Sequence, residues 1–375
     1  LRGPGTRALD GAQRAVDRLE SVVVGTGPLG RLGRRHAVLA GPAGRLGAGP
    51  PQYVADVAAA SGVDVTGLRW ALSAPGEYSS RKVLVLLFGP QPGDGLSVVV
   101  KLTRDPALNP RLENEGAALR LCADAGVEGA PRHAFSGRHA GLALLGQYAL
   151  AGRPFEAVSS GRADDPHVRD AVDWVTDLGV RTADRGLPPT AVADAAADVL
   201  ARFTDVYGSD AAEQARLAAL VDRLAGCRVP AVLAHGDPGT WNAMVTPEGR
   251  TAFLDWEAAE PSGLPLFDLF YLVRTVGLVA PGADVTRDHS RGFARAFLAD
   301  TPLRSLLVVA TRRYTAAVGV PPEAVEPLWA LTWMHRALKE ATRLHPGRLD
   351  QGHFVNVLRE SLARPDDLLA LLREP

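Results

Sequence analysis

The stretch from residue 229 to residue 257 concentrates polar side chains of the kind that bind metal ions and phosphates. It reads VPAVLAHGDPGTWNAMVTPEGRTAFLDWE, with Asp237 after an apolar run, Asn242 further along and Asp255 at the end of a second apolar run. Amide and carboxylate oxygens are the ligands that Mg²⁺ prefers in proteins. A further carboxylate beside such a pair can orient an attacking hydroxyl group, so this set of residues suits phosphoryl transfer from a nucleotide.

Residues 243–254 are expected to form a β-hairpin that carries this set. Pro followed by Glu-Gly is typical of a tight turn, and a turn centred on Glu248 and Gly249 would place Asn242 opposite Asp255. Directly opposed residues have Cβ atoms roughly 5 Å apart, so both side chains would reach one cation. The alternative is that Asp237 caps a turn and Asn242 fills an Asx-turn, but the joint spacing with Asp255 favours the chemical interpretation.

The elements that must position these residues fall into two regions. Short β-rich runs at 67–74, 81–88 and 96–102 predict an antiparallel meander, which a helix over about 109–126 and strands at 132–137 and 140–148 would follow. Beyond about residue 150 the pattern is helical, with Asp165 as N-cap and Pro166 at the first helical position of one helix. Helical patterns recur at 189–226 and from 286 onward, and the β insertion at 230–256 interrupts them.

The composition is that of an ordinary globular protein. The chain has 375 residues, of which 46% are hydrophobic, and a net charge of −1, which argues against a nucleic-acid binder. No apolar run approaches the length of a membrane span. The N-terminal residues lack the pattern of a secretory signal, and the two cysteines show no metal-binding spacing. We therefore expect a cytoplasmic protein that contacts no membrane; its oligomeric state stays open.

A glycine-rich stretch near the N-terminus has the spacing of a dinucleotide-binding turn but not its context. Residues 22–30 read VVVGTGPLG, and a poor helix-forming segment follows them. Residues 36–55 contain no acidic residue that could bind a ribose. We therefore interpret the stretch as a loop and expect the nucleotide to bind elsewhere.

The motifs resemble those of the aminoglycoside phosphotransferase/choline kinase-like family of small-molecule kinases. HGDPGTWN (235–242) matches that family's H-G-D-x-x-x-x-N, LDWE (254–257) matches its I/L-D-W/F-E, and GLPLFDLFYL adds a match with Asp268. The resemblance covers about residues 67–345. It implies an α+β, protein-kinase-like bilobal fold with a small antiparallel β lobe and a larger helical lobe. We accordingly expect an N-terminal extension over 1–65 (a helix and then a Gly/Pro/Arg-rich linker), a nucleotide-binding lobe over 66–149 and a catalytic, substrate-binding lobe over 150–375.

A kinase of this kind needs a lysine near the end of a central strand and a helical glutamate that holds it. VVVK places Lys101 at the end of the third predicted strand, in a chain with only three lysines. Glu115 shares the apolar face of the following helix, whereas Glu113 points away. Because an acid on a buried face needs a partner, we expect Glu115 to pair with Lys101.

The resemblance implies roles for further residues. Asp237 would be the catalytic residue that accepts or orients the hydroxyl proton, while Asn242 and Asp255 would hold Mg²⁺. Ser79 and Ser80 in the turn PGEYSS, and backbone groups of Gln147, Tyr148 and Ala149 in the connector, would contact the nucleotide. His235 would support the catalytic loop through the backbone, and Asp268 resembles a helix N-cap.

Other conspicuous residues have ordinary explanations. Lys82 and Lys339 are expected to be solvated, and Trp256 to be part of the core. Glu257 is either a surface acid or an aid to the metal site. The set Trp329, Trp333, His335 and Arg336 is more typical of core packing with one polar face than of a substrate cleft.

The sequence therefore predicts an ATP- and Mg²⁺-dependent kinase of a small-molecule hydroxyl, with GTP as the alternative donor. A catalytically silent nucleotide-binding module and a protein kinase are the rivals, although the chain lacks DFG and APE motifs. Residues 151–375 carry 24 basic and 30 acidic residues. This surplus favours an acceptor with an amine, such as an amino sugar or an aminoglycoside-like or nucleoside-type antibiotic, but a charge spread over the surface explains it equally well.

Overall fold

The computed structural model describes residues 37–39, 49–74, 82–183, 191–208, 210–279 and 289–373. Within them the chain forms two compact units, which we call the sheet unit and the helical unit. The sheet unit holds the described residues up to Val158 together with Trp241–Ala258, and the helical unit holds those of Ser159–Thr240 and Ala259–Pro375. The hairpin of the LDWE motif thus groups with the sheet unit, although the predicted boundary at residue 150 assigns it to the catalytic lobe.

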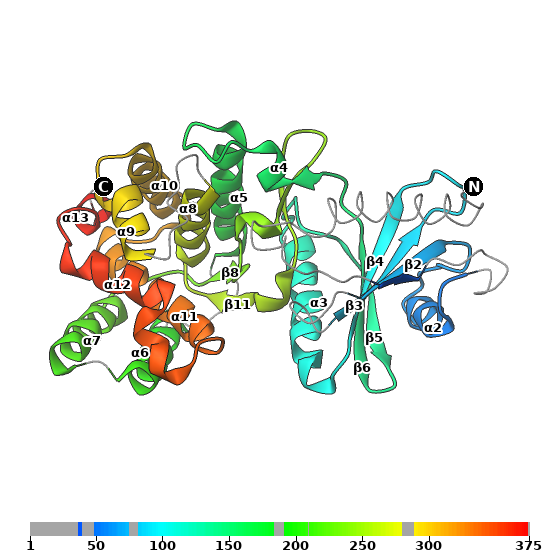
Figure 1. The fold of residues 1–375 in the computed structure, drawn as a ribbon, viewed down its shortest axis with the longest axis horizontal. Helices are drawn as coiled ribbons and strands as arrows, with labels where there is room; N and C mark the ends of the chain where they lie inside the picture. The colour runs from blue at the N-terminus through cyan, green and yellow to red at the C-terminus, as the bar shows by residue number, and fades with distance from the viewer. Residues whose placement is uncertain are drawn as a thin grey trace, which may run out of the picture. The chain divides into compact units, whose positions relative to one another are not determined.

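An antiparallel six-stranded sheet with strand order β1-β2-β3-β4-β6-β5 forms the centre of the sheet unit (Figure 1). Each strand predicted over 67–148 is present, as is the predicted helix α3. The elements of this region are β1 (Ala37–Leu39), α2 (Gln52–Ala60), β2 (Arg69–Ala74), β3 (Lys82–Phe88), β4 (Leu96–Thr103), the 3₁₀-helix η2 (Pro106–Leu108), α3 (Asn109–Asp124), β5 (His133–His139), β6 (Leu142–Tyr148), β7 (Arg153–Pro154) and α4 (Phe155–Val158).

The alternation of side chains along β4 assigns its two faces to different neighbours. Val98 and Val100 are buried in a core cluster that includes Val54 and Ala58 of α2. The intervening residues of a strand point to the opposite face, where Lys101 meets Glu115 of α3. The sheet is therefore covered on both faces, by α2 on one and α3 on the other (Figure 1).

Part of the predicted N-terminal extension belongs to this unit. Residues 52–60 form α2 rather than a linker, and Ala37–Leu39 form an edge strand paired with β2. Strand β1 pairs with β2, and α2 packs on strands that follow later in the chain. Local composition does not reveal such contacts. The predicted helix over 7–24, the glycine-rich stretch at 25–30 and the turn with Ser79 and Ser80 lie outside the described residues.

The predicted hairpin is present, but its register differs by one residue from the predicted one. Strands β9 (Ala243–Val245) and β10 (Thr251–Phe253) pair so that Ala243 lies opposite Phe253, and the Leu254 N–H donates to the Asn242 carbonyl at 2.8 Å. Asn242 is therefore opposite Leu254, not Asp255. The reason is the turn, which spans three residues between Thr246 and Arg250 and uses Gly249 at φ +78°.

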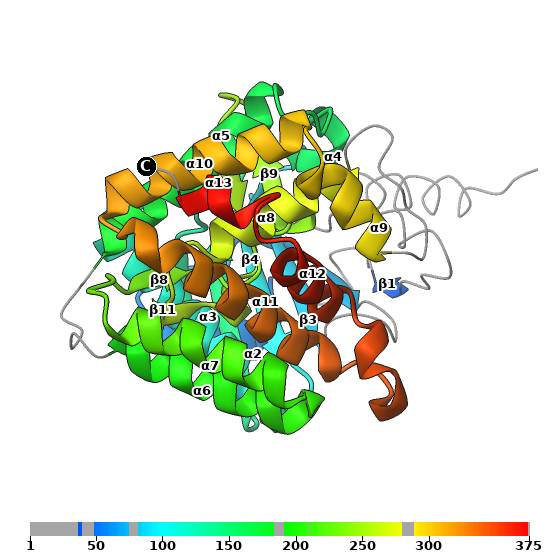
Figure 2. The ribbon, with the colours of Figure 1, turned by 90° about the vertical axis from the view of Figure 1, so that its left-hand side faces the viewer.

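The helical unit consists mainly of α-helices and contains a short two-stranded ribbon of β8 and β11, in which Ala234 pairs with Glu260 (Figure 2). Its predicted helices are confirmed, with the pattern at 189–226 divided into two helices. The elements are α5 (Pro166–Thr182), α6 (Ala191–Tyr207), α7 (Ala211–Ala225), β8 (Val232–Ala234), β11 (Glu260–Gly263), α8 (Phe267–Val279), α9 (His289–Phe293), the π-helix η5 (Ala294–Leu298), α10 (Pro302–Val318), η6 (Pro322–Ala324), α11 (Val325–Ala341), η7 (Pro346–Gln351), α12 (His353–Ala363) and α13 (Leu369–Arg373).

Helix α11 is the central helix of this unit, since it packs against α6, α7, α8, α12 and α13. Trp329 and Trp333 of α11 are 1% and 0% exposed and lie edge to face at 5.2 Å, which confirms them as core residues. Asp165 caps α5 by accepting the His167 N–H at 2.8 Å, also as predicted. None of the helices in the described part of the chain is both long and apolar enough to cross a membrane.

An antiparallel sheet unit with a larger helical unit is the α+β, protein-kinase-like fold that the sequence predicts. The residues singled out in the sequence divide between the two units. Lys101, Glu115, Asn242 and Asp255 belong to the sheet unit, and Asp237 belongs to the helical unit.

Candidate active site

A buried lysine–glutamate pair lies on one face of the sheet. The Lys101 Nζ is 2.5 Å from Glu115 Oε1, and the two residues are 8% and 0% exposed. Glu113, two residues earlier on α3, is solvent-exposed and pairs instead with Arg138 at 2.6 Å. The helix phasing read from the sequence is therefore confirmed, and the glutamate on the apolar face is the one that meets Lys101.

Asp255 joins this pair from the loop that follows β10. Its Oδ1 lies 3.5 Å from the Lys101 Nζ, and its backbone adopts the left-handed region at φ +63°. The next residue, Trp256, is 0% exposed and donates its indole N–H to the Phe253 carbonyl at 3.0 Å. The buried tryptophan thus fixes the turn that presents Asp255, and its predicted place in the core is confirmed.

Lys82 also belongs to this cluster, which contradicts the expectation that it is solvated. It is 6% exposed, its Nζ lies 3.0 Å from Asp255 Oδ1 and 3.7 Å from Glu115 Oε2, and it forms an ion pair with Glu257. Glu257 is therefore a partner of Lys82 and not an isolated surface acid. We call Lys82, Lys101, Glu115, Asp255 and Glu257 the lysine–carboxylate cluster.

The cluster keeps Lys82 charged. Burial alone would lower the pKa of the Lys82 ammonium, but the carboxylates of Asp255, Glu115 and Glu257 more than reverse this and raise it above its ordinary value. The protein thus concentrates two ammonium groups and three carboxylates on one face of the sheet unit.

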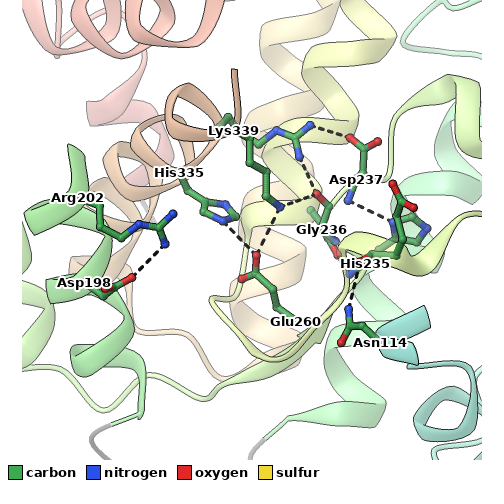
Figure 3. Close-up of polar contacts among 12 residues, drawn as sticks. Asn114, Asp198, Arg202, His235, Gly236, Asp237, Glu260, His335 and Lys339 are labelled. Atoms are coloured by element: carbon green, nitrogen blue, oxygen red, sulfur yellow. Dashed lines mark hydrogen bonds and ion pairs between the residues drawn. The ribbon is translucent and has the colours of Figure 1, made fainter. Parts of the chain in front are cut away.

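In the helical unit, the backbone of the HGD motif is fixed by a buried carboxylate. Asp268 accepts the His235 N–H at 2.5 Å and the Gly236 N–H at 3.0 Å. His235 Nδ1 accepts the Asp237 N–H at 3.2 Å (Figure 3). Asp268 lies inside the first turn of α8, which begins at Phe267, so the N-cap interpretation is wrong. Its side chain is directed to the backbone of His235 and Gly236 instead of to its own helix.

Burial raises the pKa of Asp268 to about 6, although the two backbone N–H groups it accepts act in the opposite direction. The carboxyl group therefore titrates in the mildly acidic range instead of near its ordinary value.

Arg336 of α11, which the sequence pattern assigned to core packing with one polar face, is in contact with Asp237. One guanidinium nitrogen lies 2.7 Å from Asp237 Oδ1 and another donates to the Gly236 carbonyl at 2.6 Å. The guanidinium also lies over the ring of Tyr271, 3.3 Å from its centre. Burial alone would raise the pKa of Asp237, but Arg336 outweighs burial and holds it below its ordinary value. The carboxylate is therefore ionised at neutral pH.

A signal for Arg336 was present in the sequence. Trp329, Trp333 and Arg336 follow the i, i+4, i+7 spacing of one helix face. An arginine on the buried face of a helix needs an acidic partner, which is the argument that identified Glu115. The partner, however, is 99 positions away in the sequence.

Two further α11 residues converge on Glu260 beside the HGD motif (Figure 3). His335 Nε2 lies 3.1 Å from Glu260 Oε1, and the Lys339 Nζ lies 3.5 Å from the same oxygen and 3.4 Å from the Gly236 carbonyl. Lys339 is therefore only partly solvated, contrary to expectation. Burial would raise the pKa of Glu260, but His335 and Lys339 hold it at about 2.

The residues predicted to hold Mg²⁺ fit the ion by the chemistry of their donors. Asn242 and Asp255 both belong to the sheet unit and offer an amide and a carboxylate oxygen. The described residues contain no group of three or more His, Cys, Asp or Glu that could hold a metal ion. Mg²⁺ is commonly held by only one or two carboxylates together with substrate phosphates, so a small protein donor set suits it.

Two backbone N–H groups of the connector already have hydrogen-bond acceptors within the sheet unit. The Tyr148 N–H donates to the Arg132 carbonyl and the Ala149 N–H to the Ser97 carbonyl, both at 2.9 Å. Gln147 is paired with Val99 in the sheet. The N–H groups of Tyr148 and Ala149 are therefore already used within the sheet unit.

Comparison with known proteins places the chain in a family. The model of the phosphotransferase enzyme family (APH) matches residues 72–304. No curated protein matches the chain. Among solved structures, the macrolide 2'-phosphotransferase MphH from Brachybacterium faecium is 20% identical, with 86% of this chain and 98% of that chain covered and a TM-score of 0.47.

Two aminoglycoside phosphotransferases are similar as well. The enzyme from Alicyclobacillus acidocaldarius subsp. acidocaldarius DSM 446 is 15% identical, with 79% of this chain and 89% of that chain covered and a TM-score of 0.42. APH(3'')-Id from Streptomyces rimosus ATCC10970 is 17% identical, with 82% and 98% covered and a TM-score of 0.39. The family match spans more than half of the chain, including the lysine–carboxylate cluster and the HGD motif. The chain therefore belongs to the phosphotransferase enzyme family, and it is a small-molecule kinase.

Proposed function

We propose that the protein transfers the γ-phosphoryl group of ATP to a hydroxyl group of a small molecule, in an Mg²⁺-dependent reaction. The observation that carries the proposal is the buried Lys101–Glu115 pair at 2.5 Å, with Asp255 3.5 Å from the same ammonium. A lysine held by a helical glutamate beside a metal-binding carboxylate is the arrangement that kinases use to bind nucleotide phosphates.

In this proposal Lys101 binds the α- and β-phosphates, and Glu115 keeps its ammonium in place. Asn242 and Asp255 hold the metal ion; neutralisation of phosphate charge is the chemistry that Mg²⁺ supplies when it is bound. Because the N–H groups of Tyr148 and Ala149 are used within the sheet unit, backbone donors to the adenine ring come from connector residues beyond Ala149. Ser79 and Ser80 remain predicted phosphate contacts.

Asp237 orients the acceptor hydroxyl and accepts its proton. Its carboxylate is ionised and held by Arg336, while Asp268 holds the backbone on which it stands. A carboxylate in a fixed position contributes by orienting the nucleophile and by removing its proton as the new bond forms.

For the acceptor we propose a hydroxyl compound that carries an amine, such as an amino sugar or an aminoglycoside-like or nucleoside-type antibiotic. The support is the acidic surplus of residues 151–375. Within the helical unit, Glu260 is a partly exposed carboxylate close to the catalytic loop, and its low pKa keeps it ionised at any pH at which the enzyme would work.

The experiment is an acceptor screen that follows ADP release from purified protein with ATP or GTP, with and without Mg²⁺. We expect acceptor-dependent turnover that needs the metal and is lost in Asp237→Asn, since a general base contributes about 10²–10⁴-fold. Asp164→Asn removes an exposed carboxylate of the same unit, one paired with Arg162, and should keep full activity. Nucleotide binding without turnover on any acceptor would favour the silent module, and phosphorylation of a protein substrate would favour the protein kinase.

A further inference from the structure

Lys82 and Lys101 project from the same face of the sheet. In the antiparallel pairing of β3 with β4, Lys82 lies opposite Thr103 and Leu84 lies opposite Lys101. Opposed residues share a face, and so do residues two apart on one strand. The two lysines are therefore diagonal neighbours on the α3 side of the sheet, which explains why both ammonium groups reach Glu115.

The two lysines differ in what holds them. Lys101 has its short contact with Glu115, a fully buried carboxylate of a well-packed helix. Lys82 has its shorter contacts with Asp255 and Glu257, which stand on the loop after β10 and have side chains 39% and 26% exposed. Lys82 is thus bound chiefly to the metal-ligand candidate Asp255 and its neighbour, and only distantly to Glu115.

Asp255 Oδ1 is shared by both ammonium groups, at 3.0 Å from Lys82 and 3.5 Å from Lys101. A metal ion bound at this carboxylate would compete with Lys82 for the same oxygen. Lys82, which stands beside Lys101 at the start of β3, would then lose Asp255 as one of its partners.

We propose that Lys82 is a second phosphate-binding lysine, which exchanges its pairing with Asp255 for the nucleotide phosphates when Asp255 takes up the metal ion. The inference rests on the proposed function of the sheet unit as a nucleotide site. Two ammonium groups suit a polyphosphate, because each charged hydrogen bond to a phosphate oxygen is stronger than a neutral one. Lys82 is then both a counter-ion and a ligand-binding residue.

The alternative is that Lys82 only neutralises buried carboxylates. The two roles differ in their dependence on the metal. A counter-ion affects folding and would affect nucleotide affinity equally with and without Mg²⁺. A lysine released by the metal contributes to nucleotide affinity mainly when Mg²⁺ is present.

Calorimetric titration of ATP into wild type and Lys82→Met, with Mg²⁺ and with EDTA, tests the proposal. We expect the substitution to weaken binding by about tenfold or more with Mg²⁺, and by less than about threefold with EDTA. Arg138→Met is the matched control, because Arg138 pairs with exposed Glu113 in the same unit, and its affinities should equal those of wild type. The proposal would be overturned if a folded Lys82→Met bound ATP with Mg²⁺ as tightly as the wild type does. It would also be overturned if the substitution weakened ATP binding equally with Mg²⁺ and with EDTA.

A measurement on the wild type covers the case in which Lys82→Met does not fold. The chain has only three lysines, so protein labelled with carbon-13 at the lysine ε-position gives three signals, which single Lys→Arg variants assign. We expect Mg²⁺ and a non-hydrolysable ATP analogue to shift the Lys82 signal more than the analogue does alone. A Lys82 signal that stays in place while that of Lys101 moves would overturn the proposal and leave the nucleotide site intact. If the wild type binds no nucleotide in either experiment, the proposed function itself fails.

Discussion

The contact between Arg336 and Asp237 decides in which protonation state the proposed base exists. Asp237 is faced by Arg336, by Tyr271 and by His235, and Arg336 is the group that most strongly opposes the effect of burial on its pKa. We therefore expect Arg336→Met to raise the pKa of Asp237, so that the acidic limb of the kcat/KM profile moves toward neutral pH. Arg336→Lys keeps the charge and should move the limb less, although an ammonium lacks the planar fork with which the guanidinium holds Asp237 and the Gly236 carbonyl.

The measurement is kcat/KM against pH for the wild type and both variants. A purely structural role would lower activity equally at all pH values and leave the acidic limb in place, and this outcome would contradict the prediction. Arg313→Met provides the control, because Arg313 forms an exposed ion pair with Asp173 in the same unit.

Asp268 gives the helical unit a pH dependence of stability. Its pKa of about 6 lies above the ordinary 3.8, so the folded protein binds the proton more tightly than the unfolded chain does. The contribution of Asp268 to stability is then complete below about pH 4 and is lost as pH rises through about 6. Asp268→Asn removes the titrating group. We expect the Tm difference between wild type and variant to shrink over this range as pH rises, and a constant difference would contradict the assignment.

The sequence identified residues whose partners are set by local geometry, and it missed those whose partners are distant. Helix phasing alone separated Glu115 from Glu113. Lys82 and Arg336 were missed because each owes its burial to carboxylates that are 173 and 99 positions away in the sequence. Local composition makes a lysine or an arginine look solvated, and only the tertiary fold supplies the acid that makes its burial possible.

At the scale of elements, the hairpin of β9 and β10 sets where Asp255 stands. Its three-residue loop needs a left-handed residue, which Gly249 supplies at φ +78°, and a Cβ there would meet nothing within 4 Å. We expect Gly249→Ala to destabilise the protein by about 1 kcal/mol through backbone strain alone. Gly249→Asn should cost less, because asparagine tolerates the left-handed region.

Urea unfolding of both variants and of Gly95→Ala checks this prediction. Gly95 also has open space around a Cβ but no positive φ, so its substitution should be neutral or slightly stabilising. Equal effects of alanine at both glycines would contradict a strained turn at Gly249.

For the same hairpin, the sequence predicted the strands and the turn but not their register. The pattern of 243–254 predicted both strands and the turn, but a turn of two or of three residues fits the same letters. The difference of one residue decides which side chains oppose each other. The sequence accordingly placed Asn242 opposite Asp255, whereas Leu254 is there. Strand β1 and helix α2 were not predicted for a related reason, since the strands with which they pair and pack follow later in the chain.

At the scale of the whole molecule, charge is distributed unevenly along the chain. Residues 1–50 carry eight arginines against three acidic residues, whereas residues 151–375 carry 24 basic and 30 acidic residues. Two cations, Arg336 and Lys339, stand beside the HGD motif in this acidic unit. Arg336 is matched by Asp237, and Lys339 shares Glu260 with His335. The two cations are thus each paired with a carboxylate and add no net positive charge beside the HGD motif, so the acidic surplus of the unit stays relevant to an approaching acceptor.

We therefore expect the enzyme to prefer an acceptor with an amine over its matched non-aminated alcohol, and to lose that preference as salt rises. A surplus of acids raises the local concentration of cations, and salt screens the attraction. The measurement is the ratio of kcat/KM for the two acceptors at low and high ionic strength, because the ratio cancels any effect of salt on nucleotide binding. Glu260→Gln should lower the ratio, since it removes a partly exposed carboxylate next to the loop. Asp164→Asn removes one acid from an exposed ion pair with Arg162 and should leave it unchanged. A ratio near one that neither salt nor Glu260→Gln alters would show that the acidic surplus serves the surface and not the acceptor.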